Sequence, residues 1–457
     1  MNEQEPAVLE ELHEENKMGY EPIPKLIFTM SLPIMISMLV QALYNIVDSI
    51  YVSRLSEDAL SAVSLAFPVQ NIMIAVGTGT AVGVNAVLSR ALGEKNYRRA
   101  NKTANNALFL AVASSLVFVI FGLFFTRIYF ESLTDIQAII DYGTTYTEIV
   151  TVVSFGLFGA IMTERLLTST GRTVYTMITQ MTGAVTNIIL DPILIFGYLG
   201  FPKMGIAGAA VATVAGQILA MTLGLILNIR LNHDIKLDIR QMMPEGKIIR
   251  RIYQIGVPSI VMASIGSVMN FFMNKILLSF NSTATAVFGA YFKLQSFVFM
   301  PVFGMNNGVV PIVAYNYGAR NKPRILETRR KAILYATIIM LVGLAAFQLF
   351  PQLLLGMFAP SEEMLRIGIP ALRYISLSFL LAGFSIVSIS VCQALGKSMY
   401  GLYLSLIRQL FVLLPVAWLL SRTGQLNLVW LAFPIAEFAA LLLSLYYNHR
   451  VMKVIDL

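Results

Sequence analysis

Apolar runs of about 20 residues follow one another along almost the whole chain, from about Leu26 to about Tyr447. A continuous apolar run of this length crosses the hydrocarbon core of a bilayer as one α-helix. The runs do not alternate between apolar and polar residues, which excludes a transmembrane β-barrel. Only 13% of the residues are charged, whereas a soluble protein carries roughly 25%. The sequence therefore predicts an all-α integral membrane protein.

Twelve of these runs are long enough to span a bilayer. Polar or charged turns separate them, and we expect each boundary to hold to within a few residues. The expected spans lie near residues 26–52, 60–88, 104–126, 142–165, 173–197, 206–229, 253–279, 284–313, 332–357, 367–394, 399–421 and 428–447.

The first helical hairpin, residues 31–96, recurs 225 residues later without a gap. A register kept over this length indicates that the second half of the chain duplicates the first. Because each half holds six spans, both halves enter the membrane in the same sense, which predicts two parallel six-helix repeats with a site between them. Asp48 is not duplicated, because Met273 stands at its repeat position. Matching pairs include Pro33 and Pro258, Asn45 and Asn270, Gln70 and Gln295, Gly93 and Gly318, and Gly171 and Gly396.

Charge sets the expected orientation of these spans. The loops after spans two, six and eight are rich in Lys and Arg, while the alternate loops are acidic or neutral. The positive-inside rule then predicts that the basic loops and both termini are cytoplasmic. It also accounts for the net charge of +8, so nucleic acid is not an expected partner. The basic loops contain Arg98, Arg240 and Arg324, and the opposite loops contain Glu57, Asp135 and Glu362.

The repeat and the charges together predict five regions: a cytoplasmic N-terminal tail (1–25), an N-terminal lobe (26–230), a cytoplasmic linker (231–252), a C-terminal lobe (253–447) and a cytoplasmic tail (448–457). The single cysteine, Cys392, lies in an apolar run, so no disulfide framework is expected. The three histidines, His13, His233 and His449, fall in tails and a loop. With no Ser–His pair or His–Glu metal motif in the spans, we expect neither an enzyme nor a bound cofactor.

Two carboxylates in the N-terminal half are the first candidates for chemistry. Asp48 shares one helix face with Gln41 and Asn45. Asp191 follows Asn187 by one turn and precedes Pro192, which removes a backbone donor. Carboxylate and amide oxygens at these positions suit Na⁺, or a proton shared between the two acids. The alternative is structural: a satisfied acid near a helix end, and a helix break with a polar cap. Thr213 could add a hydroxyl, although small residues around it also indicate close helix packing.

The C-terminal half carries cations within apolar spans, Lys293 and Arg408, with Glu437 as a possible partner. They either line a substrate cavity or form a buried ion pair that holds the bundle. Methionine surfaces adapt to different ligands, which favours a broad apolar substrate range. The expected cavity residues are Lys293, Arg408, Met262, Met269, Asn270 and Met300.

Residues 20–450 resemble the MATE (multidrug and toxic compound extrusion) family, nearest to its DinF- and MepA-like bacterial branch. The resemblance rests on the repeat and on SLPIMISMLVQALYNIVDSIYVSRL, GTGTAVGVNAVLSRALGEKN, and TNIILDPILIFG followed by GIAGAAVATVAGQ. It implies two six-helix lobes around a central cleft, in a bacterial cytoplasmic (inner) membrane. It also implies export of cationic or amphiphilic compounds driven by inward Na⁺ or H⁺ movement.

The resemblance places the coupling-ion site in the N-terminal lobe, at Asp48, Asn187 and Asp191, with Thr213 nearby. The NorM-like branch of the family has acidic residues in the C-terminal lobe as well. Here span seven carries Met262, Gly266 and Asn270, so coupling through that lobe is not expected.

Other functions remain open on the sequence. A flippase for a lipid-linked saccharide has a related architecture, and Lys293 and Arg408 would suit its phosphate headgroup. Such proteins often have more spans than this chain. An intramembrane enzyme and a receptor rank lower, because neither a catalytic motif nor a signalling domain is recognisable. We expect a monomer whose partners are small organic molecules and the bilayer.

Overall fold

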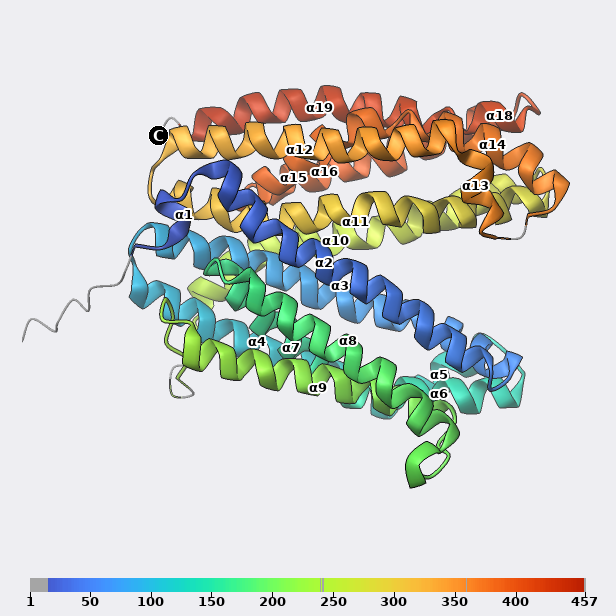
Figure 1. Cartoon of the computed structure of the whole chain (residues 1–457), viewed down its shortest axis with the longest axis horizontal. Helices are drawn as coiled ribbons and strands as arrows, with labels where there is room; N and C mark the ends of the chain where they lie inside the picture. Colours follow the sequence, from blue (N-terminus) through green and yellow to red (C-terminus); the bar gives the residue numbers. More distant parts are fainter. Residues whose placement is uncertain (1–14, 239, 241, 359, 456–457) are drawn as a thin grey trace, which may run out of the picture.

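The computed structural model describes residues 15–238, 240, 242–358 and 360–455, and almost all of them are helical (Figure 1). The part of the predicted N-terminal tail before residue 15, with His13, lies outside this description. The first half holds α1 (Lys17–Tyr20), α2 (Ile23–Ser53), α3 (Glu57–Gly93), α4 (Tyr97–Phe124), α5 (Thr126–Glu131), α6 (Gln137–Val152), α7 (Phe155–Ser169), α8 (Thr173–Phe196), the 3-10 turn η1 (Tyr198–Gly200) and α9 (Ile206–Leu231).

The second half repeats this order. It holds α10 (Gly246–Leu278), α11 (Ser282–Gly318), α12 (Lys322–Leu349), α13 (Pro351–Gly356), α14 (Glu362–Ser376), α15 (Phe379–Ala394), α16 (Ser398–Leu406), the π-helical segment η3 (Ile407–Leu413), α17 (Leu414–Ser421), α18 (Leu426–Val429) and α19 (Ala432–Ile455).

Within the described residues, ten helices are long and apolar enough to cross a membrane. Two bent pairs, α6 with α7 at 45° and α14 with α15 at 50°, bring the number to twelve when each pair is one span. The all-α membrane fold predicted from the sequence is thus confirmed. The helices extend past several expected boundaries; α10, for example, begins at Gly246 rather than near residue 253.

Polar capping residues at repeat-related positions start matching helices in both halves. Ser56 accepts from the backbone N–H of Ala59 at the start of α3, and Asn281 accepts from that of Ala284 at the start of α11. A polar side chain at this position satisfies a backbone N–H that the helix leaves unpaired. Asn96 and its repeat Asn321 cap α4 and α12 in the same way. Local sequence therefore sets matching hairpin boundaries in the two halves.

The two halves form two lobes that meet along α2, α3, α10 and α11 (Figure 1). Helix α3 packs against α10, and α2 packs against α11. The lobes lie close together at the end that carries α1 and diverge towards the opposite end. The close end also carries Arg98, Arg240 and Arg324, and we call it the basic end.

Glycines allow the two lobes to touch at the basic end. A Cβ at Gly93 of α3 would overlap the carbonyl oxygen of Tyr315 in α11. A Cβ at Gly318, the repeat of Gly93, would overlap the carbonyl oxygen of Arg90, the repeat of Tyr315. This reciprocal contact requires glycine at both positions, because only glycine lets two helix backbones approach so closely.

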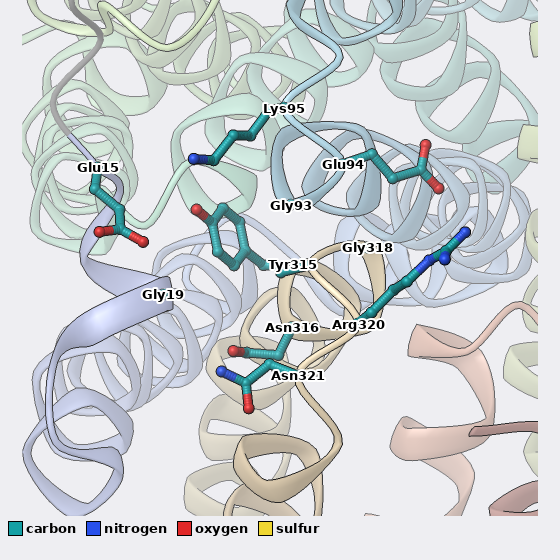
Figure 2. A pocket seen from close by; sticks show the side chains of 11 residues that line it. Glu15, Gly19, Gly93, Glu94, Lys95, Tyr315, Asn316, Gly318, Arg320 and Asn321 are labelled. Carbon is teal, nitrogen blue, oxygen red and sulfur yellow. The ribbon is translucent and has the colours of Figure 1, made fainter. Parts of the chain in front are cut away.

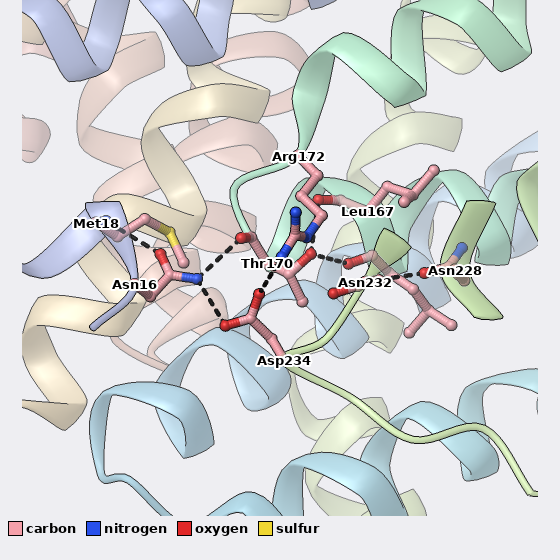
Figure 3. A network of polar contacts seen from close by, with 9 residues as sticks. Asn16, Met18, Leu167, Thr170, Arg172, Asn228, Asn232 and Asp234 are labelled. Atoms are coloured by element: carbon pink, nitrogen blue, oxygen red, sulfur yellow. Dashed lines mark hydrogen bonds and ion pairs between the residues drawn. The ribbon is translucent and has the colours of Figure 1, made fainter. Parts of the chain in front are cut away.

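Helix α1 lies across this seam and contacts both lobes. The carbonyl of Thr170, in the N-terminal lobe, and Oδ1 of Asp234, in the interlobe linker, accept from Asn16 Nδ2 at 3.0 and 3.1 Å (Figure 3). From the C-terminal lobe, Asn316 and Arg324 donate to the carbonyl of Met18 at 3.0 and 3.1 Å. Beside these contacts, Gly93, Tyr315 and Gly318 line a cavity of about 380 Å³ (Figure 2). The first described residues therefore tie the lobes together at the basic end.

Candidate functional site

The two carboxylates singled out from the sequence lie together between α2 and α8, which pack along each other. Asp191 is fully buried and Asp48 is partly buried. The two carboxyl groups are close enough to interact with each other electrostatically. A direct hydrogen bond between them would need a proton on one of the two carboxyl groups, because two carboxylates offer only acceptors. Asp48 Oδ1 has no hydrogen-bond partner in the described part of the chain, so one oxygen remains available to a proton or a cation.

Asn187 and Thr213 complete the polar cluster. With its amide oriented to satisfy every neighbour, Asn187 Nδ2 donates to Asp191 Oδ2 at 3.1 Å. Its Oδ1 then accepts from the Thr213 backbone N–H at 3.1 Å and from the Thr213 hydroxyl at 3.2 Å. Thr213 therefore positions Asn187, and Asn187 positions Asp191.

Close packing of α8 on α9 makes these contacts possible. Gly183 and Gly216 face each other one turn from Asn187, and a Cβ at Gly216 would lie 2.6 Å from the Gly183 carbonyl oxygen. A larger residue at either position would separate the two helices. The small residues of this region thus serve packing and, through packing, bring the amide of Asn187 to Thr213.

Helix α8 runs through Pro192 without a break, from Thr173 to Phe196. The sequence had left open a helix break with a polar cap at this point, and that interpretation was wrong. Proline still removes one backbone donor, which leaves the carbonyl of Ile188 without its helical N–H. This carbonyl lies on the turn between Asn187 and Asp191, so it adds an oxygen close to the cluster.

Two glutamine–tyrosine pairs surround the carboxylates, and the sequence analysis missed the tyrosines. Gln70 Nε2 donates to the Tyr146 hydroxyl at 3.0 Å, and Gln41 lies beside Tyr44. Both hydroxyls are close enough to Asp48 and Asp191 to interact with them electrostatically. The spacing of Tyr44 one helical turn before Asp48 was a usable signal for one of them.

The structure places the other two helix-face candidates less centrally. Gln41 is exposed and lies beside Tyr44. Asn45 is exposed.

The C-terminal candidates do not form one cluster with each other. Arg408 Nη1 lies 3.3 Å from Glu437 Oε2, which ties the π-helical segment η3 to α19. Lys293 is exposed, and its ammonium lies 5.9 Å from the ring centre of Phe358. Arg408 was expected either to line a substrate cavity or to form a buried ion pair, and the geometry matches the ion pair. One of the two cations that a phosphate headgroup would need is therefore already paired. Met269 is buried, whereas Met262, Asn270 and Met300 are partly exposed.

A second charged cluster in the N-terminal lobe was not anticipated from the sequence. Gln180 Nε2 of α8 donates to Glu164 Oε2 of α7 at 2.8 Å. The next residue, Arg165, donates to Asn307 of α11 at 3.3 Å, across the seam between the lobes. Adjacent opposite charges near a span end resemble an ordinary interfacial pair in the sequence, so only the packing reveals that Arg165 bridges the lobes.

Along almost its whole length, the chain is similar to a family of transport proteins. A protein-family model described as MatE matches residues 33–193 and 258–419, one match in each half. The chain is 26% identical over 430 residues to "Multidrug export protein MepA" of Staphylococcus haemolyticus, covering 93% of this chain and 94% of that protein. It is 25% identical over 435 residues to the protein of the same name from Staphylococcus aureus, covering 94% and 95%.

Solved structures share the fold. The structure described as "Outward-facing conformation of a multidrug resistance MATE family transporter of the MOP superfamily" aligns with a TM-score of 0.90 at 24% identity, over 97% of this chain and 99% of that one. The structure described as "Crystal structure of MATE in the straight conformation" aligns with a TM-score of 0.89 at 25% identity, over the same shares.

Proposed function

Because this chain belongs to the MATE family, we propose that it is a secondary active antiporter that exports cationic or amphiphilic compounds in exchange for Na⁺ or H⁺. The MepA proteins that it resembles are described as multidrug exporters. We place it in the bacterial cytoplasmic membrane as a monomer, with both termini in the cytoplasm. This orientation follows the positive-inside rule, since the basic end carries Arg98, Arg240 and Arg324.

The observation that carries the proposal is the pair of neighbouring acids, Asp48 on α2 and the buried Asp191 on α8, inside the N-terminal lobe. A carboxylate within a membrane is costly unless it is paired or serves an ion pathway. The pair can hold one proton between its oxygens. Alternatively it can hold Na⁺ with the help of Asn187 and Thr213, because hard cations prefer oxygen ligands.

The contacts between the lobes support alternating access. In this structure the lobes touch at the basic end, at Gly93, Gly318 and α1, and diverge at the other end. With the basic end in the cytoplasm, this is an arrangement closed to the cytoplasm. Loss of the ion from Asp48 and Asp191 would then favour the opposite arrangement, since a ligand shifts an equilibrium by its differential affinity for the two states.

Efflux of a fluorescent cationic dye from energised membrane vesicles tests this function. One set of vesicles carries a Na⁺ gradient at equal pH, and the other carries a pH gradient without Na⁺. We expect efflux in at least one set, and the set that responds identifies the coupling ion. Asp48→Asn and Asp191→Asn keep the side-chain size and remove the charge, so each should abolish gradient-driven efflux while the protein is still produced.

Asp141→Asn is the matched control. Asp141 is exposed on α6 and accepts from Gln137 at 2.9 Å, so its loss should leave efflux unchanged. The double variant of Asp48 and Asp191 should be no worse than either single variant, because both act as one unit. Normal efflux by Asp48→Asn under both gradients would show that the coupling site lies elsewhere.

A further inference from the structure

The loop between the lobes, which joins α9 to α10, is fixed to the N-terminal lobe by three asparagines near the start of α4. The backbone N–H of Lys236 donates to Asn101 Oδ1 at 2.7 Å. Asn105 binds the loop twice: its Nδ2 donates to the Lys236 carbonyl at 3.1 Å, and its Oδ1 accepts from the Asp238 N–H at 3.0 Å. The Glu245 N–H donates to Asn106 Oδ1 at 2.8 Å. These bonds hold the described residues 236, 238 and 245 of the interlobe loop against the basic end of this lobe.

Beside this interlobe loop lies a cavity of about 740 Å³. Helices α4 and α9 form its walls, and α7, which packs against both, forms its back. The lining from these helices is mainly apolar and includes Ala111, Val112, Phe155, Met221 and Ile229. The size falls within the range of roughly 300–1,000 Å³ that is usual for small-molecule pockets.

The cavity opens sideways into the position of the bilayer. Val112, Phe155 and Ile229, which line it, are 51%, 43% and 68% exposed. Apolar side chains this exposed on spanning helices face lipid chains, because water contact would be unfavourable there. The opening is therefore accessible to an acyl chain that enters from the membrane.

The interlobe loop adds a positive charge, that of an arginine, at the level of the lipid headgroups. Arg240 lines the cavity and is exposed. Asp238 also lines it, and its carboxylate Oδ1 accepts from the Arg240 backbone N–H at 2.9 Å. An arginine at the membrane surface above an apolar groove matches a phosphate group above an acyl chain.

We propose that this cavity is a binding site for an anionic phospholipid. One acyl chain lies between α4 and α9 against α7, and the lipid phosphate binds the Arg240 guanidinium under the interlobe loop. The site belongs to the N-terminal lobe, away from Asp48 and Asp191. Its occupancy does not depend on the transport function proposed above.

Native mass spectrometry of the purified full-length chain tests this site, with phosphatidylglycerol as the probe. Diacylglycerol supplies the chains without phosphate, and glycerol 3-phosphate supplies the phosphate without chains. We expect phosphatidylglycerol to bind and both partial probes to fail. Arg240→Gln should weaken its binding by about tenfold or more, the scale of one lost hydrogen bond to a charged group.

Val112→Trp should fill the mouth of the groove and reduce binding as well. Each variant has a matched control: Arg98→Gln changes an exposed arginine at the same end, and Val342→Trp changes a 66% exposed valine on α12 of the other lobe. Both controls should bind phosphatidylglycerol like the unmodified chain.

Three outcomes would overturn the proposal. The first is unchanged phosphatidylglycerol binding in Arg240→Gln, a substitution on an exposed side chain that leaves the helices intact. The second is equal binding of diacylglycerol, which would remove the role of the phosphate. The third is displacement of phosphatidylglycerol by a cationic dye, which would make the cavity a substrate site. Because all three are binding measurements, they remain informative even if efflux is never detected.

Discussion

Replacing Gly216 with alanine is expected to damage the candidate coupling site without touching a carboxylate. The new Cβ would lie 2.6 Å from the Gly183 carbonyl oxygen, whereas ordinary contact begins at 3.4 Å. Helices α8 and α9 would have to separate by about 0.8 Å to relieve this overlap. The hydrogen bonds of 3.1 and 3.2 Å between Asn187 and Thr213 would lengthen with them.

The size of the effect follows from two contributions. Overpacking of a close helix contact costs about 1–3 kcal/mol, and the weakened Asn187–Thr213 bonds add roughly 1 kcal/mol. At about 2 °C per kcal/mol, the scale for a long chain, the midpoint of thermal unfolding should fall by roughly 4–8 °C. Gradient-driven dye efflux should fall more than stability does, because Asn187 no longer holds Asp191 in place.

Two further variants make this prediction specific. Gly289→Ala adds the same methyl group in α11 where no atom lies within 4 Å, so both stability and efflux should be unchanged. Thr213→Val removes the hydroxyl without the overlap, so it should impair efflux with little loss of stability. Combining Thr213→Val with Gly216→Ala should be less than additive in efflux, because both changes act on Asn187. Full efflux in Gly216→Ala would refute the argument that this packing positions the site.

The remaining predictions concern the C-terminal lobe, the topology and the seam. Arg408→Met leaves the buried Glu437 carboxylate without its partner and should lower stability by roughly 3 kcal/mol; thermal unfolding of the double variant with Glu437→Leu should recover most of the loss. In a Cys392→Ser background, cysteines at positions 135 and 362 should react with an impermeant thiol reagent in intact cells, and those at 98 and 324 only after permeabilisation; labelling at 324 in intact cells would reverse the orientation. Asn16→Ala removes the bonds of α1 to Thr170 and Asp234, so spin labels on the basic ends of α3 and α11 should report a wider distance distribution, and an unchanged distribution would show that α1 does not hold the seam.

Much of the fold was predictable because its main determinants are local. Apolar length marks the spans, and the caps Ser56 and Asn281 mark matching helix starts. The bends at Val153 and at Leu377 were not predictable, because the apolar runs continue across them. Hydropathy reports only the length and composition of an apolar run. A bend changes neither, because both parts of a bent span keep an apolar surface.

The candidate site was predictable only in part, for a physical reason. Asp48, Asn187 and Asp191 stand out because polar groups in a span are rare and costly. Tyr146 and the role of Gln70 at the site were missed because tyrosine and glutamine are tolerated in a span. They also belong to helices whose adjacency the sequence does not reveal. Arg165 was missed for the related reason that its partner, Asn307, lies 142 residues away in the other lobe.

The contrast between the symmetric seam and the asymmetric acid pair bears on how an ion could drive the lobes. The seam contacts come in repeat-related pairs, since Gly93 meets Tyr315 as Gly318 meets Arg90, so the seam by itself favours neither lobe. The acid pair exists only in the N-terminal lobe, because Met273 replaces Asp48 in the repeat. Helix α2 carries Asp48 and packs against both α8 and α11. Under the proposed mechanism, loss of the ion would leave two like charges between α2 and α8. Their repulsion would act directly on α2, the helix that packs across the seam between the lobes.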